Sequence, residues 1–138
     1  MNSTLISIDT NVWIFGITNR DRLCHQILAN LINFDVILPN QVRAELRRNL
    51  TNYEMRLFYQ LTLEANIQID FETVPLPLIA DFEQKGLKKG DAEIGAFCEW
   101  RGVNLFISDN RDFLRGLSPQ HTFRVLSPAQ FCAKVGLM

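Results

Sequence analysis

The sequence predicts an α/β fold in which helices cover both faces of a mostly parallel β-sheet, as a three-layer sandwich. Short runs of apolar and β-branched residues alternate along the chain with longer segments whose apolar residues recur at helical spacing. A strand, a helix and a second strand in that order favour parallel pairing of the two strands. Because 138 residues suffice for one sizeable core, we expect residues 1–138 to form one domain.

The first strand–helix–strand unit occupies the first 40 residues. Residues 5–8 form a short β-prone run that stops at Asp9, and residues 34–38 form another that stops at Pro39. Between them, residues 22–31 place leucine and isoleucine side chains on one helical face. This order predicts two neighbouring parallel strands joined by a helix.

The rest of the chain repeats this alternation. Asn40 is a predicted N-cap, Asp91 is predicted to open a helix, and Ser127 with Pro128 is typical of a helix start. The segments expected to be helices are residues 41–50, about 53–65, part of 73–89, 92–100 and those after Pro128. The segments expected to be strands are 103–107 and 123–126.

Charge and composition narrow the class of protein. The chain carries 14 Lys and Arg residues against 15 Asp and Glu residues, so its overall charge does not indicate nucleic-acid binding. Neither a leader-like start nor an apolar run long enough to cross a bilayer is evident, and we expect a cytoplasmic protein. The three cysteines are widely spaced, which favours reduced thiols over a metal site or a disulfide.

Four acidic residues are predicted to converge at one edge of the sheet. Asp9 and Asp109 follow predicted strands, and the carboxyl ends of parallel strands border the functional crevice of such folds. Asp91 begins a helix, and Glu45 lies at the rim of the apolar face of its own helix. Each has a simpler explanation, because aspartates often cap helices and Glu45 could form a surface ion pair with Arg48 or Arg47.

Taken together, the four carboxylates favour a metal site. Carboxylates that lie close together repel one another unless a cation takes up their charge. Ligation by oxygen alone selects Mg²⁺ or Mn²⁺ over zinc. The sequence therefore predicts a divalent-cation site built from Asp9, Glu45, Asp91 and Asp109.

Four short motifs, in order along nearly the whole chain, resemble those of the PIN-domain ribonuclease family. They are Ile8-Asp9-Thr10-Asn11-Val12, Leu38-Pro39-Asn40-Gln41-Val42-Arg43-Ala44-Glu45-Leu46, Gly90-Asp91-Ala92 and Ser108-Asp109-Asn110-Arg111-Asp112-Phe113. The resemblance implies a PIN-like fold and a metal-dependent phosphodiesterase that cleaves RNA. Small members that stand alone are often toxins of toxin–antitoxin pairs, of the VapC type.

The resemblance also implies roles for individual residues. Asp9, Glu45, Asp91 and Asp109 match the acidic quartet, which would be both catalytic and metal-binding. Asp112 is a further candidate ligand, or an anchor of the turn, and Glu93 is near enough in sequence to join the site. The residues implied to orient the carboxylates are Thr10, Asn11 and Ser108. The basic residues expected to bind RNA are Arg43, Arg47, Lys89 and Arg111.

The function expected is a Mg²⁺- or Mn²⁺-dependent endoribonuclease, with an antitoxin protein or a second copy of the chain as candidate partners. Two apolar stripes on the helix near residues 53–65 favour such a partner. An RNA-processing PIN nuclease that is not a toxin, and an inactive PIN-like module that binds RNA or protein, remain open. A haloacid-dehalogenase-like phosphatase fits less well, because it requires a second aspartate where Asn11 stands. A receiver-like phospho-acceptor would place paired acids after the first strand, where Asp9 is single.

Overall fold

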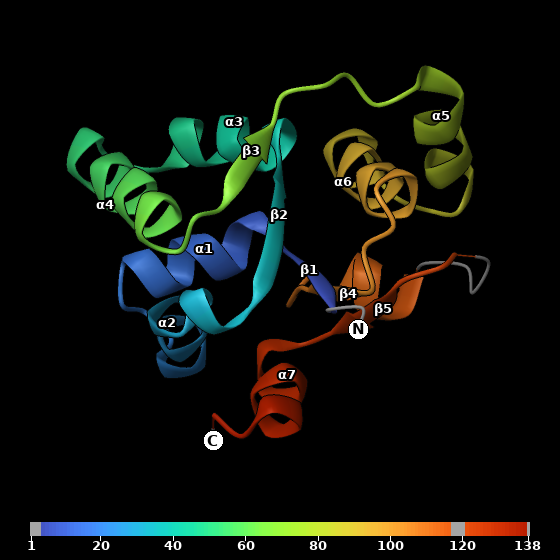
Figure 1. Cartoon of the computed structure of the whole chain (residues 1–138). Helices are drawn as coiled ribbons and strands as arrows, with labels where there is room; N and C mark the ends of the chain where they lie inside the picture. Colours follow the sequence, from blue (N-terminus) through green and yellow to red (C-terminus); the bar gives the residue numbers. More distant parts are fainter. Residues whose placement is uncertain (1–3, 117–120, 138) are drawn as a thin grey trace.

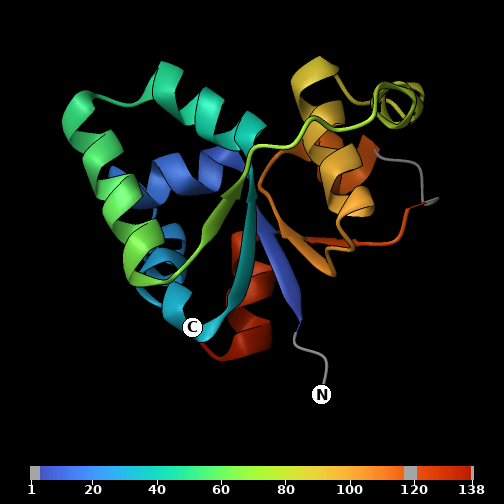
Figure 2. The same cartoon turned by 45° about the horizontal axis from the view of Figure 1, so that its top comes forward.

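A computed structural model describes residues 4–116 and 121–137. The sheet contains five strands in the order β3-β2-β1-β4-β5. All four pairings between neighbouring strands are parallel. Figures 1 and 2 show α1 to α4 on one side of the central strands, with α5 and α6 on the other. The predicted three-layer α/β sandwich around a parallel sheet is confirmed.

The elements have the following bounds. The strands are β1 (Leu5–Ile8), β2 (Asp35–Pro39), β3 (Gln68–Asp70), β4 (Leu105–Ile107) and β5 (Arg124–Leu126). The helices are α1 (Thr10–Ile17), α2 (Arg22–Ala29), α3 (Asn40–Asn49), α4 (Asn52–Glu64), α5 (Leu76–Gln84), α6 (Lys89–Trp100) and α7 (Pro128–Val135). A short 3₁₀ helix η1 (Leu31–Asn33) precedes β2, and a π-helical turn η2 (Asp112–Gly116) follows β4.

Four local expectations are corrected by the structure. Helix α1 was not predicted, and it begins directly after Asp9, whose side chain accepts a hydrogen bond from the Thr10 amide. Strand β3 was not predicted either, since three residues are too short to show a period. Asn40 is the first residue of α3 and not its cap. Asp91 lies inside the first turn of α6, because that helix already begins at Lys89.

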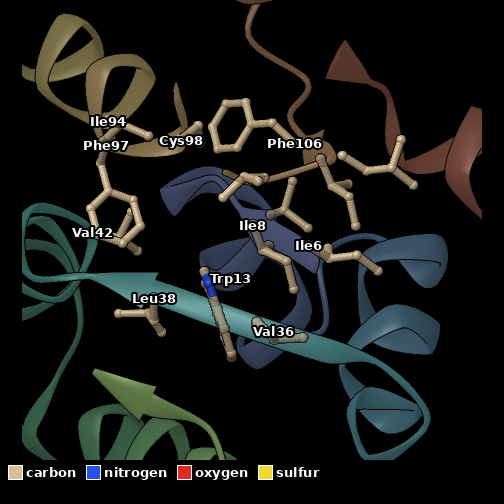
Figure 3. Close-up of a cluster of buried hydrophobic side chains, with 14 of the residues drawn as sticks. Ile6, Ile8, Trp13, Val36, Leu38, Val42, Ile94, Phe97, Cys98 and Phe106 are labelled. Atoms are coloured by element: carbon tan, nitrogen blue, oxygen red, sulfur yellow. The ribbon is translucent and has the colours of Figure 1, made fainter. Parts of the chain in front are cut away.

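The core lies on both faces of the sheet. In β1 the side chains of Ile6, Ser7 and Ile8 are all buried, as expected for a central parallel strand covered on each side. Figure 3 shows Ile6 and Ile8 among side chains contributed by β2, α1, α3, α6 and β4. The fully buried Trp13 packs edge-on against Phe58, with ring centroids 5.1 Å apart. This packing holds α1 and α4 against each other.

The parallel sheet brings the carboxyl ends of its strands to one edge. Asp9 follows β1, Asn40 follows β2 and Ser108 follows β4, so the residues that leave these strands gather beside the starts of α1 and α3. Within the described ranges, no helix combines the length and apolar character that a bilayer crossing requires.

Candidate active site

Asp9 is the buried centre of the acidic edge, with only 4% of the residue exposed. Its Oδ1 accepts a hydrogen bond from the Thr10 amide at 2.8 Å, and its Oδ2 accepts one from the Ser108 hydroxyl at 2.7 Å. Burial raises the pKa of Asp9 from 3.8 to about 7, against the lowering effect of these two hydrogen bonds. The charges of Asp91 and Glu45 raise this pKa further, so both carboxylates lie near Asp9.

Glu45 is held next to Asp9 by two donors. The Thr10 hydroxyl donates to Glu45 Oε1 at 2.5 Å, and the Gln41 side-chain amide donates to Oε2 at 2.8 Å. Thr10 therefore links the two carboxylates, because its backbone amide binds Asp9 and its hydroxyl binds Glu45. Glu45 is half-buried on α3 and makes no surface ion pair with Arg47 or Arg48 among the described side chains.

The start of α6 packs closely against Glu45, and Gly90 makes this approach feasible. A Cβ atom at position 90 would lie 2.9 Å from Glu45 Oε2 and 3.3 Å from Gln41 Nε2. The first turn of a helix carries partial positive charge, which favours nearby carboxylates. Asp91 in this turn does not cap the helix, since Lys88 occupies the N-cap position. The simpler explanation of Asp91 as a cap therefore does not apply.

The turn after β4 is organised by Asn110. Its backbone amide donates to Ser108 Oγ at 3.0 Å, and its side-chain amide donates to Asp91 Oδ2 at 3.0 Å. Its Oδ1 accepts from the backbone amide of Asp112 at 2.9 Å. Because Ser108 in turn donates to Asp9, Asn110 connects the surroundings of Asp9, Asp91 and Asp112.

Asp91 lies among acidic side chains. Partial burial raises its pKa, the Asn110 hydrogen bond lowers it, and the charges of Glu45 and Asp112 raise it again. The Lys88 ammonium acts in the opposite direction. The structure thus brings together Asp9, Glu45, Asp91 and Asp112, which we call the acidic cluster.

Asp109 faces a different neighbourhood from the one expected. The residue is exposed, and its pKa is raised by partial removal of the carboxyl from water and by the charge of Asp21. Asp21 caps α2, where its side chain accepts from the Cys24 amide. The charge of Asp21 at the start of α2 thus acts on Asp109, whereas the charge of Asp112 acts on Asp91.

Among the described side chains, no cation forms an ion pair with the acidic cluster, and the charge of Lys88 acts on Asp91 without such a pair. The ion pairs described within residues 4–116 and 121–137 join Lys85 to Asp81 and Arg101 to Asp70 and Glu72, and these acidic residues all lie outside the cluster. An all-oxygen donor set with uncompensated charge suits Mg²⁺ or Mn²⁺. In the same ranges, no three acidic, histidine or cysteine side chains already converge on one point at ligand distance. The donor chemistry fits a divalent cation, and Glu45 and Asp91 would have to turn toward it from their present hydrogen bonds.

The remaining predicted residues lie around this cluster to different degrees. Thr10 and Ser108 contact the carboxylates, whereas Asn11 is exposed on α1 without a hydrogen bond to any described carboxylate. Glu93 is half-buried on α6. The expected RNA-binding side chains are exposed or half-buried: Arg43, Arg47, Lys89 and Arg111.

Sequence reasoning missed three residues that shape the site. Gln41 precedes Glu45 by four residues, the spacing at which helical side chains meet, and this could have identified it. Asn110 precedes Asp112 by two residues, the spacing of an Asx turn. Gly90 carried no such signal, because the close approach of α3 and α6 is a tertiary contact.

A family model described as PIN domain matches residues 6–116 of this chain. These residues include every member of the acidic cluster. A comparison with curated proteins gives no match.

Solved structures support the same fold. VapBC2 from Rickettsia felis, bound to a DNA fragment from its promoter, is similar at a TM-score of 0.65 with 16% identity, covering 90% of this chain and 98% of that chain. DNA-bound VapBC from Salmonella typhimurium gives a TM-score of 0.61 with 18% identity, covering 91% and 98%. PAE2754 from Pyrobaculum aerophilum gives 0.58 with 11% identity, and both chains are covered completely. At such identities the likeness is one of fold.

Proposed function

The chain belongs to the PIN domain family, and from that premise we propose that it is a divalent-metal-dependent endoribonuclease. The observation that carries the proposal is the buried Asp9 carboxylate, placed next to Glu45 and Asp91 without an ion pair to any of the three among the described side chains. A structural aspartate of this kind would be paired with a base or replaced by a neutral residue, because burying uncompensated charge is costly. A catalytic cation site accounts for that cost.

Asp9, Asp91 and Glu45 would hold Mg²⁺ or Mn²⁺, and Asp112 is the fourth carboxylate in reach. Asp109, the fourth residue of the expected quartet, is the weaker candidate because it lies beside Asp21. A bound cation would supply an activated water and would neutralise charge on the scissile phosphate.

The protein residues would orient these groups. Ser108 and the Thr10 amide fix both oxygens of Asp9, so its position changes little when substrate binds. Once the Glu45 carboxylate has released its hydrogen bonds from Gln41 and Thr10, it would accept a proton or a hydrogen bond from the attacking water. Hydrolysis by in-line attack would leave a 5′-phosphate and a 3′-hydroxyl. The exposed side chains of Lys89, Arg111 and Arg47 would contact the RNA backbone.

We further propose that the activity belongs to a toxin of a toxin–antitoxin pair. Two of the structural neighbours are VapBC assemblies, which favours this role over a solitary RNA-processing enzyme. A partner would bind between α2 and α4. A cavity of about 330 Å³ there is lined by Leu28, Leu57 and Leu61 among others, and a neighbouring cavity of about 270 Å³ shares Leu28 and Leu61.

These two neighbouring cavities, which together form a groove, indicate which side of α4 a partner would contact. The buried face of the helix consists of Met55, Phe58 and Thr62, whereas Tyr53 and Leu63 are exposed. Leu61 lies between the two sides and lines the groove. Leu61→Glu should prevent co-purification with a co-expressed antitoxin and leave RNA cleavage intact. Unchanged co-purification would argue against this docking site.

The decisive experiment is cleavage of total tRNA and rRNA by the purified chain with Mn²⁺, with Mg²⁺ and with EDTA. Cleavage should require the cation, should leave 5′-phosphates, and should be lost in Asp9→Asn. RNA binding without cleavage under every condition would support the inactive binding module instead. Failure to bind or cleave RNA would refute the proposed function.

A further inference from the structure

Phe71 is an exposed aromatic residue at the same edge of the sheet as the acidic cluster. It follows β3 directly, and 63% of the residue is accessible to solvent. The last residue of β3, Asp70, pairs with Pro39 at the end of β2. Strands lie about 4.8 Å apart and β3 is two strands from β1, so the end of β3 lies about 10 Å across this edge from Asp9. Figure 2 shows the chain after β3 passing the start of α3 toward α5.

Arg43 is held in a fixed orientation against this ring. Its guanidinium carbon lies 5.5 Å from the centre of the Phe71 ring. Its Nε donates to Asn40 Oδ1 at 2.8 Å, which ties the guanidinium to the first residue of α3. The other N–H groups of an arginine remain as donors after this bond. Among the described side chains, no carboxylate forms an ion pair with Arg43.

The two acidic residues that flank Phe71 both pair with Arg101, whose single positive charge balances one of their two negative charges. Arg101 Nε lies 2.7 Å from Asp70 Oδ2, and Arg101 Nη2 lies 2.9 Å from Glu72 Oε2. Without Arg101, these carboxylates would repel a phosphate that approached Arg43. Arg101 thereby weakens this repulsion, and Arg43 is the cation that lies beside the ring itself.

We propose that Phe71 and Arg43 form a stacking platform for single-stranded RNA, on which Phe71 stacks one base and Arg43 contacts an adjacent phosphate. The proposal rests on the proposed ribonuclease function and adds how its substrate is held. A ring combined with an oriented guanidinium matches the way proteins bind unpaired nucleotides. An apolar protein contact is less favoured, because it would take the Arg43 guanidinium beside the ring out of water without an anion to pair with it.

Kinetics of three variants test the platform on a single-stranded oligoribonucleotide with Mn²⁺. Phe71→Leu removes the ring and keeps an apolar side chain, and it should raise KM about tenfold while leaving kcat nearly unchanged. Phe71→Trp keeps a ring and should restore the wild-type KM. Tyr53→Leu is the matched control, because Tyr53 is 66% exposed on α4, beyond the far end of α3, and its loss should leave KM unchanged.

Binding to abasic oligoribonucleotides tests the stacked base directly. In the cleavage-deficient Asp9→Asn background, removal of the base at one position should weaken binding on the order of tenfold. Adding Phe71→Leu should abolish that sensitivity.

The outcomes separate the two levels of the proposal. If the wild-type protein cleaves RNA and Phe71→Leu retains its KM, the platform is refuted and the ribonuclease stands. An equal rise in KM for Tyr53→Leu would refute it as well, and so would a loss of self-association in Phe71→Leu without any effect on RNA. A wild-type protein that neither binds nor cleaves RNA would refute both proposals.

Discussion

Replacing Asp9 with asparagine should stabilise the metal-free protein, and increasingly so as the pH rises. The folded structure raises the pKa of Asp9 from 3.8 to about 7, chiefly by burial and further through Asp91 and Glu45. A carboxyl with a raised pKa binds more protons in the folded than in the unfolded chain between these two pH values. Stability is therefore complete below about pH 4 and is lost as the pH rises toward 7.

The structure sets the magnitude of this effect. A difference of about three between the two pKa values corresponds to ~4 kcal/mol of unfolding free energy above pH 7. Asparagine avoids this cost. Its amide nitrogen, however, would face the Ser108 hydroxyl that donates to Asp9 Oδ2, and the loss of that hydrogen bond reduces the gain in stability by ~1 kcal/mol. We expect Asp9→Asn to be ~3 kcal/mol more stable than wild type at pH 8, and no more stable at pH 4.

Urea unfolding followed by circular dichroism, in EDTA at pH 4, 6 and 8, measures this difference. Asp35→Asn is the control, because Asp35 is exposed at the start of β2 and its replacement should give no such trend. Excess Mn²⁺ should stabilise the wild type by ~2.7 kcal/mol at a hundred times its Kd and should stabilise Asp9→Asn less. A difference between the two proteins that does not change with pH would refute the reasoning, as would a wild-type stability indifferent to Mn²⁺.

Four further substitutions test the acidic cluster and the residues next to it. Asp91→Asn removes charge next to Glu45 without removing a cap, so without metal the variant should melt at a higher temperature than wild type. Calorimetry should show that Mn²⁺ raises its melting temperature less than that of wild type, and a cleavage assay should show no RNA cleavage. Gly90→Ala places a methyl group 2.9 Å from Glu45 Oε2, and assays should show a loss of kcat of at least about tenfold with a nearly unchanged melting temperature. Asp112→Asn should reduce cleavage more than Asp109→Asn, because Asp112 lies beside Asp91; the reverse order in parallel assays would return the fourth ligand to Asp109.

The elements predicted from sequence were those with a clear period or cap. The strand at Leu5–Ile8 and the helix at Pro128–Val135 have such signals, a β-prone run in one case and a Ser127 capping box in the other. Helix α1 was missed because its eight residues are apolar on nearly every side, which leaves no amphipathic period to read. Strand β3 is only three residues long, and its pairing with β2 defines it.

The sequence by itself determined that Asp9 would stand at the carboxyl end of a strand, because the short β-prone run Leu5–Ile8 stops there. It also determined that Glu45 would lie at the rim of the buried face of α3, through the spacing of Val42 and Leu46. Only the tertiary structure decided which acidic residue after β4 joins them. Neighbouring positions in a turn point in different directions, and the Asn110 hydrogen bonds to Asp91 and to the Asp112 amide set that choice. Such bonds depend on how closely α6 approaches the turn, and nothing in the spacing of residues along the chain encodes that distance.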